Sequence, residues 1–317
     1  MNTVSTNPYP STTPRAAVAA LRALVWTALL VLNHSMTLAA PAMVTILDGE
    51  ARVFHASGSA KVVEALALPA AAIVQTTDAS RLLRVEWADG SALDLGPATK
   101  VLIVTEGLSE RAAKLPGIYL LRGWAKLSGA AGATSPVLMS ALGELPPFKG
   151  VAVMSLFDGA DAGTPSGVFS EVGPLLWQER GGKALVTLAT GQFFARAQGQ
   201  ASQVLPRPPA ALLQALPRAF RDTLPHRLVA MQQREVKPTT LALPPYAELQ
   251  AWLAASDPQL RRLLVQRFGA WSRDAALKRE LLAHLNDHRE WSALVLPKPA
   301  APPSPPTQTN KAPGAPP

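Results

Sequence analysis

The sequence predicts an α+β protein whose N-terminal part is mainly β and whose C-terminal part is all α. From Met43 to about Ala201, short segments of Val, Leu, Ile and Trp are separated by Gly, Asp-Gly and Pro, as in strands joined by turns. From Leu205 the composition changes to Arg, Leu, Ala and Gln, with prolines where segments begin, as in helices that use Pro in their first turn. Nine residues of 297–317 are proline, which predicts a disordered tail.

Composition sets the broad class of the protein. The 317 residues are 48% hydrophobic and 16% charged, with a net charge of +8 and no cysteine. A chain of this length and apolar content is expected to fold as about two packed domains. The lack of cysteine excludes disulfide scaffolds, Cys-ligated zinc and thiol catalysis.

Residues 1–42 have the form of a secretory signal peptide. Two arginines precede the uncharged run Ala23–Leu32, and small residues at Ala40 and Ala42 suit signal peptidase. We expect cleavage between Ala42 and Met43, which would leave the mature protein in the periplasm. The alternative is an uncleaved membrane anchor over 16–40.

Two β regions are expected, over residues 43–128 and 129–204. In the first, Asp48-Gly49 is expected to turn the chain between two strands. Between Leu83 and Trp87 the apolar side chains alternate with Arg84 and Glu86, which predicts one buried face and one solvent-exposed face. In the second, Gly181-Gly182 predicts a hairpin turn. The expected strands are 44–47, 51–55, 83–87, 93–95, 101–104, 151–157, 168–172, 175–179 and 184–188.

Residues 205–296 are expected to form a basic helical domain, a small bundle. Helices should begin at Pro208-Pro209, Pro217 and Pro245, and Asp257-Pro258 should cap another. The buried stripe of that helix is Leu260, Leu263, Leu264, Phe268 and Trp271. Ser272 is expected to cap the last helix, with a stripe of Leu277, Leu281 and Leu285.

Three stretches of the first β region resemble the periplasmic domain of the FecR family of bacterial envelope regulators. They are Gly49-Glu50-Ala51-Arg52-Val53, the segment 75–81 (Gln-Thr-Thr-Asp-Ala-Ser-Arg), and 85–96, which contains Asp89-Gly90-Ser91 between two alternating strands. The resemblance implies an antiparallel β sandwich or roll, followed here by the second β unit.

Two departures from the family bear on function. Ala71-Ala72 stands where the family commonly has Gly-Asp before the Thr-containing turn. The family's regulators also carry a cytoplasmic domain that binds a sigma factor, whereas about 22 residues precede the apolar run here. Direct control of a sigma factor is therefore not expected.

Candidates for chemistry are few, and each has a simpler structural interpretation. His284 and His288 would share one side of a helix as two metal ligands, with Asp287 and Glu290 close by, but no Glu follows His284 as in metalloproteases, and a third ligand would have to come from elsewhere. Asp158 and Asp161 lack the remaining ligands of a calcium loop. Ser135 and Ser166 lie in Gly-rich loops outside a nucleophile motif, and the segment 129–135 lacks the Gly-Lys of a phosphate loop. We expect no catalytic residue, metal or cofactor.

Positive charge points to a partner surface. Residues 205–297 contain 13 Lys and Arg against 8 Asp and Glu. Arg261, Arg262, Arg267 and Arg273 are the candidates for contact with an acidic polymer or lipid headgroups, although ordinary solvation of an amphipathic helix is the favoured explanation of their clustering. Nucleic acid is not expected, because no aromatic residues interleave with Lys or Arg. The oligomeric state is not predicted.

The sequence therefore predicts a non-enzymatic envelope protein that binds another envelope component. One alternative is a protein that acts on or binds cell-wall glycan, for which Glu86, Asp89 and Asp94 are the clustered acids; the alternation places them on the solvent face. Another is a membrane-anchored sensor with an uncleaved N-terminal helix.

Overall fold

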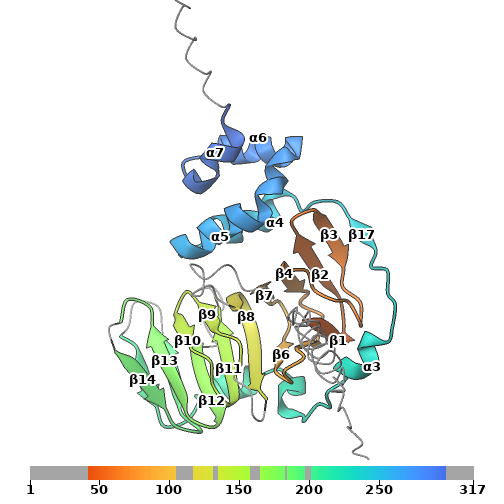
Figure 1. Ribbon diagram of the computed structural model, residues 1–317. Coiled ribbons are helices and arrows are strands. Elements are labelled where there is room, and N and C mark those ends of the chain that lie inside the picture. Colours follow the sequence, from red (N-terminus) through yellow and green to blue (C-terminus); the bar gives the residue numbers. More distant parts are fainter. Residues whose placement is uncertain are drawn as a thin grey trace, which may run out of the picture. The chain divides into compact units, whose positions relative to one another are not determined.

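The computed structural model of the chain describes residues 42–104, 117–130, 135–157, 165–182, 184–196 and 201–297, and it is mainly β with helices at the C-terminal end (Figure 1). The strands are β1 (Met43–Asp48), β2 (Ala51–His55), β3 (Gly58–Lys61), β4 (Ala71–Thr76), β5 (Leu82–Glu86), β6 (Ala92–Leu95), β7 (Lys100–Val104), β8 (Ile118–Gly129), β9 (Leu138–Ser140), β10 (Gly143–Leu145), β11 (Gly150–Leu156), β12 (Ser166–Val172), β13 (Leu175–Glu179), β14 (Leu185–Leu188), β15 (Phe193–Arg196), β16 (Gln203–Leu205) and β17 (Thr240–Leu241). The helices are α2 (Ala210–Ala215), η2 (Arg218–Arg221), α3 (Leu228–Gln232), α4 (Tyr246–Leu253), α5 (Pro258–Phe268), η3 (Gly269–Arg273), α6 (Ala275–Ala283), η4 (Arg289–Trp291) and α7 (Ser292–Val295).

Strand β8 joins two groups of strands. Its C-terminal part pairs with β6 and β11, within the antiparallel order β1-β5-β6-β8-β11-β12-β15-β16. Its N-terminal part pairs with β7 and β9, within the order β17-β3-β2-β4-β7-β8-β9-β10-β13-β14. We call these groups A and B. Because β8 belongs to both, it connects the two predicted β regions across their expected boundary.

A glycine lies where β8 passes from group B to group A. Gly123 has a φ of 99°, and a Cβ atom there would lie 2.5 Å from Thr99 Oγ1 and 2.6 Å from its Cα. The Thr99 hydroxyl in turn accepts a hydrogen bond from the Trp124 amide at 3.0 Å. A residue with a side chain would be strained at this φ, and its Cβ would collide with Thr99, the residue just before β7. The absence of a side chain therefore lets β8 serve both groups.

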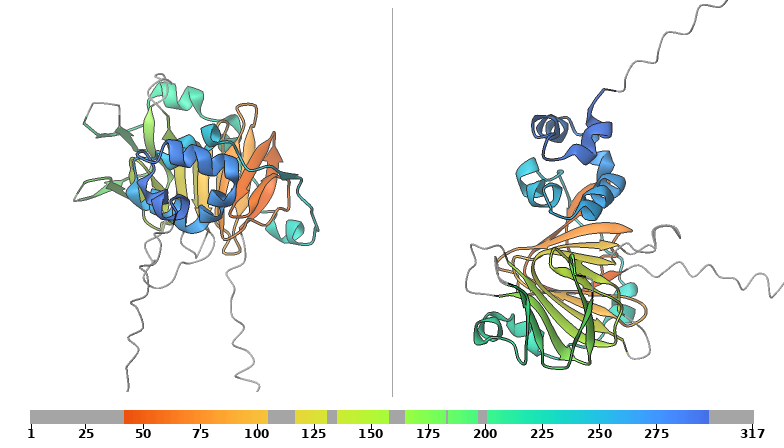
Figure 2. Two further views of the ribbon diagram at one scale, coloured as in Figure 1. Left: turned by 90° about the horizontal axis from the view of Figure 1, so that it is seen from above. Right: turned by 90° about the vertical axis from the view of Figure 1, so that its left-hand side faces the viewer.

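The helices and strands share hydrophobic cores. The largest core contains side chains of both groups, such as Val85 and Leu127 from group A and Val74 and Trp177 from group B. A second core joins α4 to α7 with strand residues of group B: Phe54, Ile73, Leu102, Tyr119 and Met139. Figure 2 shows these helices together over the strands. Within the described ranges, no helix is long and apolar enough to cross a bilayer.

Most expected element starts are confirmed. Asp257 caps α5, accepting the Gln259 amide at 2.9 Å, and β13 and β14 form the expected antiparallel pair. Asp48-Gly49 turns the chain between β1 and β2 as expected, but the two strands do not pair with each other: β1 pairs with β5, while β2 pairs with β3 and β4.

The last predicted helix begins later than expected and ends earlier. Asp274, not Ser272, caps α6, accepting the Leu277 amide at 2.8 Å, while the Ser272 hydroxyl donates to Gly269. A carboxylate accepts an amide proton at an N-cap better than a hydroxyl already engaged elsewhere. Because α6 ends at Ala283, His284 and His288 do not share a helix. The segment 1–41, Asp158, Asp161 and the tail from Lys298 lie outside the described residues.

Candidate functional site

Five charged side chains follow one face of group A, and we call them the charged belt: Arg84 and Glu86 on β5, Asp94 on β6, Lys126 on β8 and Glu171 on β12. The strand register places Arg84 opposite Asp94 and Asp94 opposite Lys126. Cross-strand partners share one face of a sheet. Charges that alternate with apolar residues in the sequence thus line up across three neighbouring strands.

Four of the five members of the belt are buried, all except Glu171, which corrects the prediction of a solvent-exposed face for β5. Arg84, Glu86 and Asp94 are 5%, 0% and 3% exposed, and Lys126 is 8% exposed. The acids offered for a glycan-cleaving site therefore do not face an open groove. Asp89 is separate from them, and its Oδ1 accepts the Ser91 amide in the turn after β5.

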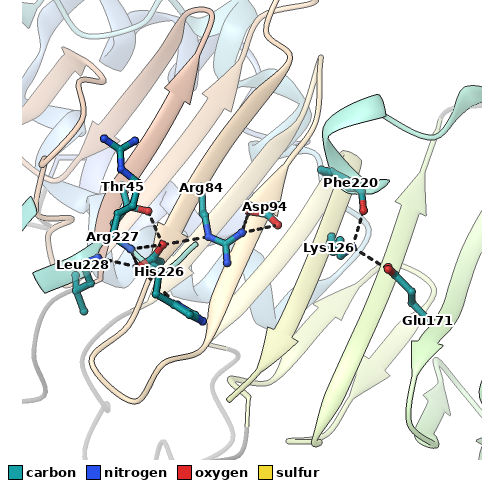
Figure 3. Close-up of polar contacts among 10 residues, drawn as sticks. Thr45, Arg84, Asp94, Lys126, Glu171, Phe220, His226, Arg227 and Leu228 are labelled. Atoms are coloured by element: carbon teal, nitrogen blue, oxygen red, sulfur yellow. Dashed lines mark hydrogen bonds and ion pairs between the residues drawn. The ribbon is translucent and has the colours of Figure 1, made fainter. Parts of the chain in front are cut away.

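Glu86 is the most heavily bonded member of the belt. Its Oε1 accepts hydrogen bonds from Thr45 Oγ1 at 2.9 Å and Arg84 Nε at 3.1 Å. Its Oε2 accepts from the backbone amides of Arg227 at 3.0 Å and Leu228 at 2.9 Å, where α3 begins (Figure 3). A buried carboxylate is stable only when charged or polar donors replace its lost water. Glu86 therefore fastens a segment 141 residues away in sequence to β5.

Lys126 makes a second attachment at the other end of the belt. Its Nζ donates to Glu171 Oε1 at 2.9 Å and to the backbone carbonyl of Phe220 at 2.5 Å (Figure 3). Phe220 belongs to η2 and is 1% exposed. The ammonium group thus exchanges water for one carboxylate and one carbonyl, and it holds η2 against β8.

Asp94 lies between the two attachments. Its carboxylate oxygens lie 3.2 and 3.3 Å from Arg84 Nη1. Burial raises the pKa of Asp94 to about 6, and the negative charges of Glu86 and Glu171 add to this rise. The positive charges of Arg84 and Lys126 oppose it. Desolvation is the largest of these effects, since a carboxylate loses its hydration inside the fold.

The segment that covers the belt is named the strap, residues 205–241, and comprises α2, η2, α3 and β17. Leu212 and Phe220 pack with strand residues such as Trp124, and Leu228 and Met231 pack with Met43 and Ala65. β17 then pairs with β3. The strap therefore has apolar as well as polar anchors along its length.

A glycine permits the close approach of the strap. A Cβ atom on Gly96 would lie 2.8 Å from Pro217 Cγ and 2.8 Å from Trp124 Cβ. Contacts below 3.0 Å do not occur between real side-chain carbons without displacement. Gly96 ends the stretch quoted for the FecR resemblance, so one end of that stretch is where the strap docks.

An apolar groove lies on the outer side of β13 and β14. Its volume is about 430 Å³, and its lining includes Pro146, Phe148, Pro174, Leu176 and Thr187. Within the described part of the chain, β14 pairs with β13 alone. Leu176 and Leu185, on the outer face of this pair, are 47% and 53% exposed. An unpaired strand edge thus lies beside exposed leucines.

The four arginines predicted to bind a partner occupy different environments. Arg261 donates to Glu290 at 2.7 Å and to the carbonyl of Ala255 at 2.6 Å. Arg262 and Arg273 are exposed, and Arg267 is half-buried. At least one of the four is therefore held by internal contacts.

The side chains considered for metal or nucleophilic chemistry have structural roles. His284 stacks on Tyr246 with ring centroids 5.0 Å apart, and the Tyr246 hydroxyl contacts His288 Nε2. Among the described residues, no group of three His, Cys, Asp or Glu side chains is placed to hold a metal ion. Ser135 and Ser166 accept the amides of Phe148 and Phe157, which braces their loops.

The predicted cleavage bond lies at the start of the described chain. Ala42 is fully buried and its carbonyl accepts the Leu68 amide at 2.8 Å, while Met43 is the first residue of β1. Cleavage between Ala42 and Met43 would therefore remove a buried residue whose carbonyl is bonded to Leu68.

Comparison with known proteins assigns no family. No family model matches the chain, and no curated protein matches it. Among solved structures, it is similar to a putative anti-sigma factor from Parabacteroides distasonis, with a TM-score of 0.35 and 10% identity over 44% of this chain and 61% of that one. A similarity of this size supports no assignment.

Proposed function

We propose that this chain is a FecR-like, non-enzymatic protein of the periplasm that binds an extended, apolar segment of another envelope protein along β14. The observation that carries the proposal is that β14 forms an edge of the sheet among the described strands. β14 is paired on one side among the described strands, and Leu176 and Leu185 lie exposed next to it. Unpaired backbone groups and neighbouring apolar side chains are what an added strand uses for affinity and specificity.

The groove beside β14 supports the same kind of partner. Its walls are built largely from proline, leucine and phenylalanine, with Lys149 among them. A concave apolar surface of a few hundred Å³ accepts side chains of a bound segment. A partner strand on β14 would place alternate side chains beside Leu185 and Thr187 on the outer face, and Thr187 also lines this groove.

A non-catalytic role is supported by the hydrogen bonds that the buried charged groups of the belt make within the protein. Each oxygen of the Glu86 carboxylate accepts hydrogen bonds from within the protein. Lys126 is likewise bonded to Glu171 and Phe220. Catalytic acids need access to substrate, whereas these groups attach the strap to group A.

The FecR-like assignment is supported by contacts between the quoted stretches. Ser80 Oγ accepts the Glu50 amide at 3.1 Å and the Thr77 amide at 3.2 Å, so the turn of the second stretch binds the start of the first. We further propose that groups A and B form a β sandwich, because the largest core takes side chains from both.

The proposed binding edge can be tested by site-specific photo-crosslinking in the native envelope. One photoreactive residue replaces Leu185, and a matched control replaces Leu213 of the strap, which is 43% exposed. We expect a discrete protein adduct at position 185 alone, mapped by mass spectrometry to an extended apolar segment. Leu185→Lys should abolish capture from a crosslinker at Thr187, because a lysine at an edge opposes strand addition. Equal labelling at 185 and 213, or none at 185, would contradict the proposal.

A further inference from the structure

The strap is attached to group A by both ends of the charged belt. Glu86 holds the first amides of α3, and Lys126 holds the carbonyl of Phe220 in η2. Between these attachments, Arg84 is shared by two acids. Its Nε bonds Glu86 at 3.1 Å and its Nη1 bonds Asp94 at 3.2 Å.

Because Arg84 is shared, the protonation state of Asp94 affects how strongly Glu86 holds the strap. With every member ionised, the belt has three negative and two positive charges, and one proton on Asp94 makes it neutral. A neutral Asp94 no longer competes with Glu86 for the charge of Arg84. The Glu86 carboxylate then keeps the full electrostatic support of the guanidinium while it accepts the α3 amides.

We propose that the charged belt is a proton-operated latch that holds the strap against group A more tightly in mildly acidic conditions than at neutral pH. The device consists of Asp94 as the proton acceptor, Arg84 as the shared cation and Glu86 as the anchor. It does not depend on the identity of any binding partner.

The raised pKa of Asp94, about 6 against an ordinary 3.8, agrees with this direction. Between these two values the folded protein binds a proton that the unfolded chain does not bind. Stability from this group is therefore gained as the pH falls through about 6, and it is complete below about 3.8.

Other titratable groups face the same cluster. His226 Nδ1 lies 3.7 Å from Glu86 Oε2 and is 60% exposed, and it is charged only when protonated. Glu64 pairs with Arg227 and Arg234 near the same end of the strap. Lys126 on β8 and Glu171 on β12, the remaining members of the belt, also act on Asp94.

Hydrogen exchange can distinguish a contribution of Asp94 from one of His226. Exchange of the Arg227 and Leu228 amides is measured between pH 5 and 8, corrected for intrinsic rates and referred to amides in the centre of β8. We expect protection in the wild-type protein to rise by about five- to tenfold from pH 8 to pH 5, with the rise beginning near pH 6; a shift of Asp94 from 3.8 to about 6 allows about tenfold over this range.

Three variants complete the test. Asp94→Asn should abolish the pH dependence and keep the high protection. His226→Gln should retain the pH dependence, and Asp222→Asn, an exposed acid of the strap, should match the wild type. A pH dependence lost in His226→Gln and kept in Asp94→Asn would overturn the proposal. If Asp94→Asn does not fold, the wild-type profile decides, since protection without an inflection between pH 5 and 7 also overturns it.

Discussion

Replacing Glu86 by Gln tests whether the belt, and not only apolar packing, holds the strap. The two carboxylate oxygens accept from Thr45, Arg84 and the α3 amides. In Glu86→Gln one oxygen becomes an NH₂ group that faces donors, and the fully buried Arg84 loses a countercharge. Removing one partner of a buried ion pair costs about 3–5 kcal/mol, so we expect a loss of unfolding free energy of this order.

The matched control is Glu64→Gln. Glu64 also pairs with strap arginines, Arg227 at 3.4 Å and Arg234 at 3.5 Å, but its side chain is 29% exposed and those of its partners more so. Ion pairs of this kind contribute about 0–1 kcal/mol. Urea denaturation followed by tryptophan fluorescence measures both variants. A Glu86→Gln loss of under about 1 kcal/mol, or equal losses in both variants, would refute the assignment of Glu86 as an anchor.

Three further results are expected. Gly96→Ala should lower the unfolding free energy by about 1–3 kcal/mol, because its Cβ collides with Pro217; urea titration measures this, and a neutral result would show that the strap shifts easily. Asp257→Ala should lower the unfolding free energy by about 2 kcal/mol or more, since Asp257 is 1% exposed, caps α5 and pairs with Arg180 at 2.7 Å. Thermal denaturation measures this loss, and Asp274→Ala, which removes a helix cap but no such ion pair, should lose less stability. Intact-mass analysis of the protein from the periplasmic fraction should give Met43 as the first residue, and a chain that keeps residues 1–42 would instead favour the uncleaved anchor.

Local signals in the sequence predicted many elements because their causes are local. The helix after Asp257-Pro258 forms where expected, and the stripe from Leu260 to Trp271 is buried. Capping and helical periodicity depend on residues within a few positions. The Gly181-Gly182 turn likewise lies between β13 and β14, because a glycine turn and its flanking strands are adjacent in the chain.

The charged belt was not predictable in the same way. Alternation in β5 indicates which side chains share a face, but not what covers that face. Here the cover is α3, whose amides reach Glu86 from 141 residues along the chain. A signal was present in retrospect: Arg84, Glu86 and Asp94 contain both signs of charge on neighbouring strands, as buried polar clusters require. β8 was missed for a related reason, because its partners are distant in the sequence and change along its length. It pairs with β7 and β9 before Gly123 and with β6 and β11 after it.

The distribution of charge changes the interpretation of the basic C-terminal half. The bundle from Tyr246 to Pro297 contains seven Lys and Arg but six Asp and Glu, whereas the strap has six against two. Most of the excess thus lies on the strap, where Arg207, Arg218 and Lys237 are exposed. Long-range attraction to an acidic surface depends on the net charge of a region, so the strap, rather than Arg261 and its neighbours, is the part of this half best suited to it. If the belt governs how firmly the strap is held, it also governs how these cations are presented.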